Sequence, residues 1–229
     1  MRKPTLLALA FLTLIAPQVR AGANHNGTLV WHLDSTVAYT TDLDYYCGAS
    51  GIACGTDLSG CDNGYDHQDD CRERIGSLNP TGPPDTGTYV ASVLAAFPEG
   101  SCPELKAASF GLGDYDTGNV TFVDYGPCAS VELNTAGWPG PNEGTAVTFS
   151  NVVRSQLIEI YWFAAYAYYT DRDGSLPLTG GPDGEGFFSD DSDPVVHDPI
   201  VGFSTLGLKG DRLQRTSDWL RCNGGVLSE

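Results

Sequence analysis

The sequence predicts an all-β protein built as an antiparallel β-sandwich and stapled by disulfides. Its 28 glycines and 14 prolines are spread along the chain and break it at turn-like sites, which leaves little room for long helices. Between the breaks lie short runs rich in β-branched and aromatic residues, a composition typical of strands. Seven cysteines predict disulfides because the chain also opens with an export signal, and exported proteins fold in an oxidising compartment.

Seven runs between the breaks are candidate strands. They are TLVWHL (28–33), TYVASVLAAF (88–97), LKAASFGL (105–112), NVTFVDY (119–125), TAVTFSNV (145–152), LIEIYWFAAYAYY (157–169) and VGFSTLGL (201–208). In 88–97 and 157–169 the odd-numbered and the even-numbered residues are both mostly apolar. Because alternate residues of a strand project from opposite faces, this pattern predicts central strands covered on both faces. A buried helix is the alternative for 157–169, but its six aromatic residues favour a strand. The tail DRLQRTSDWLRCNGG predicts one short C-terminal helix beginning at Asp211.

Residues 1–23 have the three parts of a secretory signal peptide. A basic start, MRK, precedes the apolar stretch 5–16, and the small residues AGA (21–23) provide an A-x-A cleavage site. The apolar stretch has twelve residues, whereas a helix needs roughly 20 to span about 30 Å of hydrocarbon. We therefore expect cleavage before Asn24 and secretion into the periplasm or the medium, with residues 24–229 forming one β-sandwich domain.

The mature chain is expected to be strongly acidic. Without the three basic residues of the leader, nine lysines and arginines face 29 aspartates and glutamates, which leaves a net charge near −20. Such a surface repels phosphate backbones and anionic lipid headgroups. Nucleic acid is therefore excluded as a partner, and with no long apolar segment the mature chain is not expected to insert into a membrane.

A cysteine-rich acidic loop spans residues 47–71. Zinc sites usually present close C-x-x-C pairs, whereas here six residues separate Cys54 from Cys61 and nine separate Cys61 from Cys71. A zinc cage of these three cysteines with His67 is the alternative. Export favours disulfides, so we predict a stapled, hydrophilic loop projecting from the β framework.

Pairing each cysteine with its neighbour predicts three bridges and leaves Cys222 unpaired. The predicted bridges are Cys47–Cys54, Cys61–Cys71 and Cys102–Cys128. In the chain-entropy account each such short loop contributes about 2.5 to 3.5 kcal/mol. The sequence alone leaves the connectivity open.

The densest acidic patch lies in GPDGEGFFSDDSDPVVHDP (181–199). Its carboxylates on a glycine-rich loop suit calcium, which accepts six to eight oxygens in irregular geometry. Solvated acidic turns are the simpler interpretation and calcium binding the alternative. The candidate calcium ligands are Asp183, Glu185, Asp190, Asp191 and Asp193.

No enzyme motif stands out. The four histidines, at 25, 32, 67 and 197, accompany neither a G-x-S-x-G elbow nor an H-E-x-x-H helix, so no catalytic residue is assigned. A secreted hydrolase using a carboxylate pair stays open because the acids are abundant. Trp31 and Trp162 lie in apolar strands and are expected in the core, whereas Trp138, in the turn GWPGPNEG, is the candidate exposed ring for stacking on a sugar.

Several strings resemble a known kind of domain. VLAAFPEGSCPELKAASFG, FVDYGPCASVELNTAGWPGPNEGTAVTF, IEIYWFAAYAYY and DPIVGFSTLGL together resemble an uncharacterised exported domain that recurs in secreted proteins of uncultured bacteria. The resemblance covers most of residues 28–208. It implies a single exported domain, supports the pairs Cys47–Cys54 and Cys102–Cys128, and carries over no catalytic or binding residue.

These observations together predict a jelly-roll-like or cohesin-like sandwich that acts as a non-catalytic extracellular or surface interaction module. The expected partner is an extracellular protein or a glycan, and calcium is the only cofactor considered. A calcium-dependent carbohydrate-binding module, with Trp138 and the acids of 183–198 as its site, is the alternative. The carboxylate-pair hydrolase is the third reading.

Overall fold

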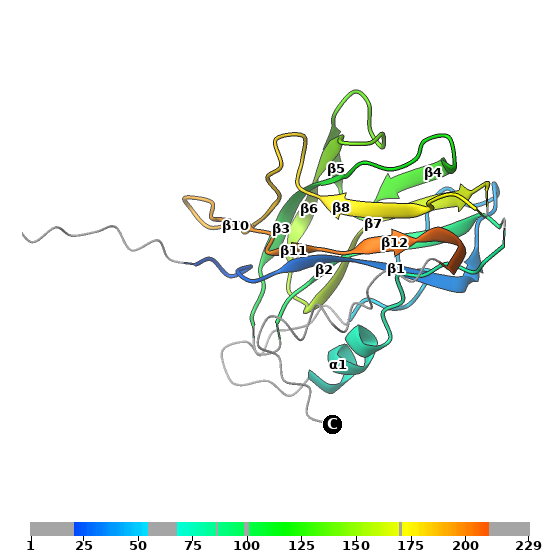
Figure 1. The fold of residues 1–229 in the computed structure, drawn as a ribbon. Coiled ribbons are helices and arrows are strands. Elements are labelled where there is room, and N and C mark those ends of the chain that lie inside the picture. The colour runs from blue at the N-terminus through cyan, green and yellow to red at the C-terminus, as the bar shows by residue number, and fades with distance from the viewer. Residues whose placement is uncertain (1–20, 55–67, 86, 99–100, 170, 211–229) are drawn as a thin grey trace, which may run out of the picture.

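The computed structural model describes residues 21–54, 68–85, 87–98, 101–169 and 171–210, which fold into two packed β-sheets (Figure 1). The first sheet contains, in order, β11 (Gly202–Phe203), β1 (Thr28–Ala38), β2 (Tyr89–Ala96), β7 (Leu157–Ala167) and β4 (Val120–Pro127). The second contains, in order, β10 (His197–Pro199), β9 (Phe187–Ser189), β3 (Leu105–Leu112), β6 (Gly144–Val153) and β5 (Val131–Asn134). Two further strands extend it: β8 (Ser175–Thr179) pairs with β3, and β12 (Thr205–Gly207) pairs with β8. Only β1 and β11 pair in parallel among these strands. The predicted antiparallel sandwich is confirmed.

Large side chains from the inner faces of both sheets form one core. Trp31 and Phe163 come from the first sheet, and Phe110 and Phe188 from the second; all four are fully buried. The Trp31 indole N–H donates to the carbonyl of Leu176 at 3.0 Å, so its polar atom is satisfied inside the core. Burying these rings supplies the main driving force for closing the sandwich.

The aromatic strand β7 is central and covered on both faces, as the sequence predicts. It lies between β2 and β4, and ten of its eleven residues are buried. Val93 pairs with Tyr161 and Leu94 pairs with Glu159, so Ile160 between them is an extra residue in β7 that forms a β-bulge. Because of this bulge, neighbouring Ile160 and Tyr161 both join the inner core, while Glu159 and Trp162 belong to the outer face.

The outer face of the first sheet is covered by the cysteine-rich region, which is therefore not a free hydrophilic excursion in its described parts. Residues 39–54 cross this face, and Tyr46 packs its ring 4.9 Å from that of Trp162. Helix α1 (Gln68–Gly76) lies below β1 and β2 in Figure 1, and its Ile75 packs against the apolar residues of the same face. We call this layer, residues 39–54 and 71–78, the cover.

One carboxylate lies beneath the cover. Glu159 accepts a hydrogen bond from the Ser92 hydroxyl at 2.5 Å and another from the Gly48 N–H at 2.6 Å. Burial raises the pKa of Glu159 above its ordinary value, although both hydrogen bonds oppose that rise. The contact with Gly48 ties the cover to the centre of the sheet.

The disulfides differ from the neighbour pairing. Cys47 is bonded to Cys128 and Cys54 to Cys71, so the predicted Cys47–Cys54, Cys61–Cys71 and Cys102–Cys128 pairs are wrong. The reason is tertiary: the cover carries Cys47 to the end of β4, where Cys128 follows the strand, and α1 returns Cys71 to Cys54. Cys102 is also disulfide-bonded. Cys61, Cys222 and the zinc candidate His67 lie outside the described residues.

Six of the seven predicted strands are present, and the seventh is divided. The run 201–208 forms β11, β12 and the short helix η1 (Leu208–Gly210) instead of one strand. The sequence did not predict β5, β8, β9 or β10, which are only three to five residues long. The predicted C-terminal helix and residues 1–20 of the leader lie outside the described residues. No helix in the described ranges has the length and apolar character to cross a membrane.

Candidate interaction surface

The outer face of the second sheet presents two rows of paired side chains. Register defines them, because residues directly opposite each other in an antiparallel pair project from the same face. One row is His197, Ser189, Ala107, Thr148 and Val131. The other is Pro199, Phe187, Ser109, Ala146 and Leu133. We call these ten residues the open face.

The open face lacks the layer that covers the other sheet. Ala107 and Ser109 lie on β3, the strand that pairs with both β6 and β9, yet both are partly exposed because their own side chains are small and no layer covers them. At the β5 edge, Leu133 is 75% exposed and Val131 is 55% exposed. None of the apolar residues of the open face belongs to a core cluster of the described chain. The result is an open surface, about 20 Å across its five strands.

The charge of the open face contrasts with the rest of the molecule. The whole chain carries a formal net charge of −17, whereas the open face holds no acidic, lysine or arginine residue. Its one titratable side chain is His197, which lies at the β10 edge. An uncharged patch on a strongly acidic protein is typical of the centre of a protein interface, where charged residues are depleted.

The open face also contains a histidine–hydroxyl pair, Ser189 with His197, of the kind that could suggest nucleophilic catalysis. The Ser189 hydroxyl lies 2.7 Å from Nδ1 of His197, and the His197 ring packs against that of Phe187 at 4.9 Å. A serine nucleophile needs a base that is itself oriented by a third group. The described partners of His197 include no carboxylate, and Asp198 next to it is buried on the inner side of the strand. The contacts with Ser189 and Phe187 instead hold the His197 imidazole over β9.

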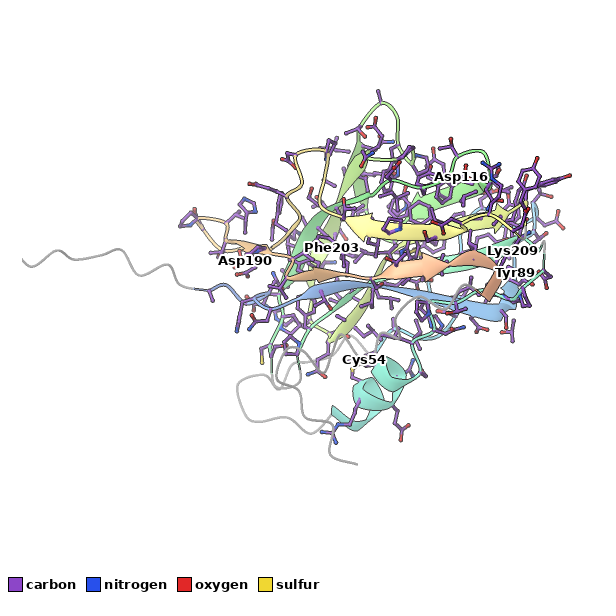
Figure 2. The ribbon with its side chains drawn as sticks, in the orientation of Figure 1. Cys54, Tyr89, Asp116, Asp190, Phe203 and Lys209 are labelled. Atoms are coloured by element: carbon purple, nitrogen blue, oxygen red, sulfur yellow. A yellow bond between two sulfur atoms is a disulfide. The ribbon has the colours of Figure 1, made fainter. Side chains whose placement is uncertain are left out.

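The acidic patch is distributed between turns and strand interior. Asp190 is buried at the end of β9 beside β10 (Figure 2), where its Oδ1 accepts the Val196 N–H at 2.9 Å and the Ser192 hydroxyl at 2.7 Å. Burial alone would raise the pKa of Asp190, but these hydrogen bonds outweigh it and hold that pKa below its ordinary value. Asp183 caps a turn by accepting the Glu185 N–H at 3.1 Å.

The candidate calcium ligands do not gather into a site. Asp190 accepts hydrogen bonds from the N–H groups of Ser192 and Val196 in its own loop. The other candidate ligands are exposed: Asp183, Glu185, Asp191 and Asp193. In the described ranges no three histidine, cysteine or acidic side chains are close enough together to hold a metal ion. The segment 181–199 therefore combines exposed acidic turns with the strands β9 and β10, and calcium binding stays a prediction.

Trp138 is buried, so the expectation of an exposed sugar-stacking ring was wrong. Its exposed fraction is 5%, and its ring packs edge-on against Phe110 at 5.8 Å and Tyr161 at 5.7 Å. The indole N–H donates to the Tyr161 hydroxyl at 2.9 Å, and that hydroxyl donates to Glu132 at 2.8 Å. The turn folds back over the core, which gives the indole both apolar packing and a polar partner.

Sequence reasoning missed the open face although a signal for it is present. In the strand LKAASFGL the small residues Ala107 and Ser109 alternate with the core residues Ala108 and Phe110. Such alternation indicates one face packed and one face free. The signal is weak because alanine lies on both faces.

Comparison with known proteins finds cohesins. The chain is similar to a cohesin module from a Clostridium perfringens family 33 glycoside hydrolase, with 8% identity, 57% of this chain and 90% of that chain covered and a TM-score of 0.40. It is similar to a type I cohesin in a cohesin–dockerin complex from Clostridium thermocellum (12% identity, 56% and 88% covered, TM-score 0.37). It is also similar to a non-cellulosomal cohesin from Archaeoglobus fulgidus (11% identity, 56% and 85% covered, TM-score 0.37).

These similarities concern the fold. The β-sandwich itself is established by the strand pairing, and the solved structures named here are cohesin modules. The sequence matches no family model and no curated protein. Any partner of this chain therefore has to be argued from its own surface.

Proposed function

We propose that this protein is exported and acts as a non-catalytic interaction module that binds another extracellular protein through the open face. The observation that carries this proposal is the asymmetry of the two outer faces. The cover seals the outer face of the first sheet with apolar contacts and the Cys47–Cys128 and Cys54–Cys71 bridges. The outer face of the second sheet has exposed Leu133 and Val131 and no such layer among the described residues.

The chemistry of the open face favours a protein over a sugar. Sugar sites rely on exposed aromatic rings, and the open face offers one, Phe187, which is only partly exposed and packs against His197. The alanine, serine and threonine residues in these rows instead suit the close approach of another protein's apolar patch. Because the surrounding surface is acidic, the partner we expect carries lysine and arginine residues around that patch, which speeds its association at low salt.

Photocrosslinking tests this proposal directly. A benzoyl-phenylalanine in place of Leu133, in the full chain secreted by its own host, should give a defined protein adduct on irradiation. The same residue in place of Leu43, which is 52% exposed but lies on the cover, should not give that adduct. Raising the salt from about 0.05 to 0.5 M before irradiation should lower the adduct yield, because electrostatic attraction is screened. Equal labelling from both positions, or a carbohydrate adduct, would contradict the proposal.

A further inference from the structure

Asp198 is a buried carboxylate that receives the N-terminal segment. It lies on β10, and its exposed fraction is 3%. Asp198 is in register with Phe188 of β9, which is in register with Ala108 of β3, so the three side chains project from the inner face of the sheet. Its Oδ1 accepts the backbone N–H of Gly22 at 2.7 Å, and its Oδ2 accepts that of Asn24 at 3.0 Å. Both donors belong to residues 21–24, where the sequence predicts that the leader is removed.

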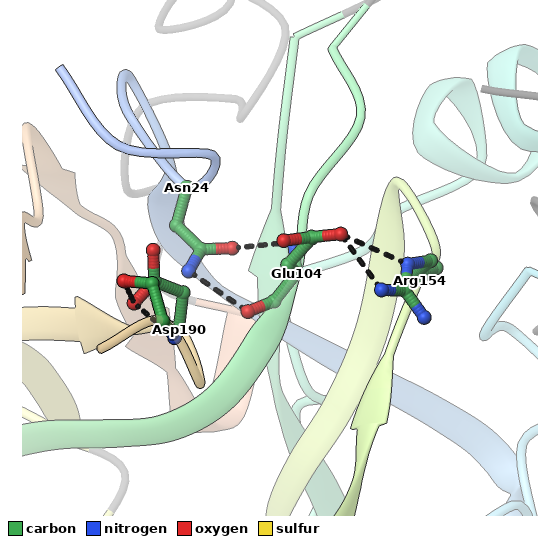
Figure 3. A network of polar contacts seen from close by, with 5 residues as sticks. Asn24, Glu104, Arg154 and Asp190 are labelled. Carbon is green, nitrogen blue, oxygen red and sulfur yellow. Dashed lines mark hydrogen bonds and ion pairs between the residues drawn. The ribbon is translucent and has the colours of Figure 1, made fainter. Parts of the chain in front are cut away.

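Asn24 is held in place by contacts that do not involve the leader. Its side chain is completely buried and pairs with the backbone of Glu104: the Asn24 amide donates to the Glu104 carbonyl at 3.2 Å, and the Glu104 N–H donates to Asn24 Oδ1 at 3.0 Å (Figure 3). The Glu104 carboxylate in turn pairs with Arg154 at 2.7 Å. The nitrogen of Asn24 therefore keeps its position when the preceding residues are cut away.

We propose that leader removal converts the Asn24 nitrogen into an α-ammonium that forms a buried ion pair with Asp198. This inference rests on the proposed export. Hydrolysis of the Ala23–Asn24 bond consumes one water: the Ala23 carbonyl keeps the oxygen and leaves with the leader as a carboxylate, and the Asn24 nitrogen gains protons. A neutral N–H donor 3.0 Å from a buried carboxylate thereby becomes a cationic donor. Cleavage after Ala21 gives the same pair through the Gly22 nitrogen.

Asp198 is the carboxylate available for this ammonium. The Oδ1 of Asp190 is occupied by Ser192 and Val196. The Glu104 carboxylate points away to Arg154. His25 is exposed, with its Nδ1 2.7 Å from the Gly22 carbonyl, and His197 projects from the opposite side of β10 toward Ser189.

The ion pair between the Asn24 ammonium and Asp198 would connect leader cleavage to the open face. Asp198 lies between His197 and Pro199, and both of these belong to the open face. Fixing Asp198 from the inside therefore fixes the β10 margin of the open face. Leader removal replaces the neutral N–H donors of this buried carboxylate with a cationic donor, and the resulting charge pair holds the β10 edge of the open face.

The test compares four full chains exported with their own leader. They are the wild type, Asp198→Asn, a chain with Gly-Ser inserted between Ala23 and Asn24, and the chain with both changes. The insertion keeps the Asn24 N–H as a donor but moves the ammonium away by two residues, and it leaves Asp198 intact. N-terminal sequencing first establishes where each chain begins.

The first readout is the acylation rate of the α-amine at pH 7. Pairing raises the α-amine pKa above its ordinary value of about 7.7 to 8.0, and each unit lowers the reactive fraction about tenfold. We expect the wild-type amine to react at least about tenfold more slowly than that of Asp198→Asn, and the inserted chain to react like an ordinary peptide. The second readout is Tm against pH: stability from the pair is fully present below about pH 8 and is lost as the pH rises through the raised pKa. Asp198→Asn and the inserted chain should lack this loss.

Two contrary outcomes separate the proposals. If the wild-type chain is cut at the predicted site but its amine reacts as fast as that of the inserted chain, the ion pair is wrong and export stands. If the exported protein retains residue 1, both export processing and the ion pair are wrong. Should Asp198→Asn fail to fold, the comparison of the wild type with the inserted chain still decides between these outcomes.

Discussion

Trp138→Ala should lower the free energy of unfolding by about 3 to 5 kcal/mol, the range for truncating a large buried aromatic residue. The expected loss has two sources. The first is the cavity left among Phe110, Tyr161 and Phe163, whose rings surround the indole. The second is the Tyr161 hydroxyl, which loses the donor at 2.9 Å while it stays buried. Urea unfolding monitored by circular dichroism measures the change.

Tyr45→Ala provides the matched control, because Tyr45 is an aromatic residue that is exposed on the cover. Its loss should change the unfolding free energy by no more than about 0.5 kcal/mol. A Trp138→Ala chain within about 1 kcal/mol of the wild type would mean that the ring is not packed in the core.

Removing the Cys47–Cys128 bridge should destabilise the protein more than removing Cys54–Cys71. The first bridge joins residues 81 apart and the second residues 17 apart. The chain-entropy account gives about 4.5 kcal/mol for the longer loop and about 3 kcal/mol for the shorter one. The longer bridge also ties the cover to the end of β4, so its loss should expose Trp162.

The Cys47→Ser/Cys128→Ser and Cys54→Ser/Cys71→Ser chains should be compared by urea unfolding and by quenching of tryptophan fluorescence. We expect the larger loss of stability and the larger rise in quenching in the first chain. The opposite order would show that the cover is held mainly at α1. Non-reducing peptide mapping of the wild type should recover both bridges.

The sequence predicted most of the strands because their signals are local. In LIEIYWFAAYAYY both sets of alternate positions are mostly apolar and six residues are aromatic, and these two local properties together indicated a strand covered on both faces. The nature of the outer layer could not be predicted in the same way. The contacts of Tyr46 with Trp162 and of Ile75 with the sheet join segments far apart in the chain, and no local pattern encodes them.

The errors at Trp138 and at the cysteines share one physical cause. Glycine and proline around Trp138 indicate a turn, but they do not show whether the ring points outward or back over the core. Likewise, neighbour pairing assumes that closeness in sequence decides closeness in space. Cys47 instead meets Cys128 because the cover crosses the whole sheet.

The affinity of the crosslinked partner for two arginine variants shows whether the open face is the surface that binds it. Ser109→Arg places a large cation in the middle of the open face, and Ser35→Arg places the same side chain on an exposed site of β1. If the open face binds a basic-rimmed protein, Ser109→Arg should raise Kd by about 30-fold or more, as for a central interface residue worth at least about 2 kcal/mol. Ser35→Arg should leave Kd within about threefold of the wild type, and both variants should keep the wild-type Tm. An unchanged Kd for Ser109→Arg would show that the partner binds elsewhere.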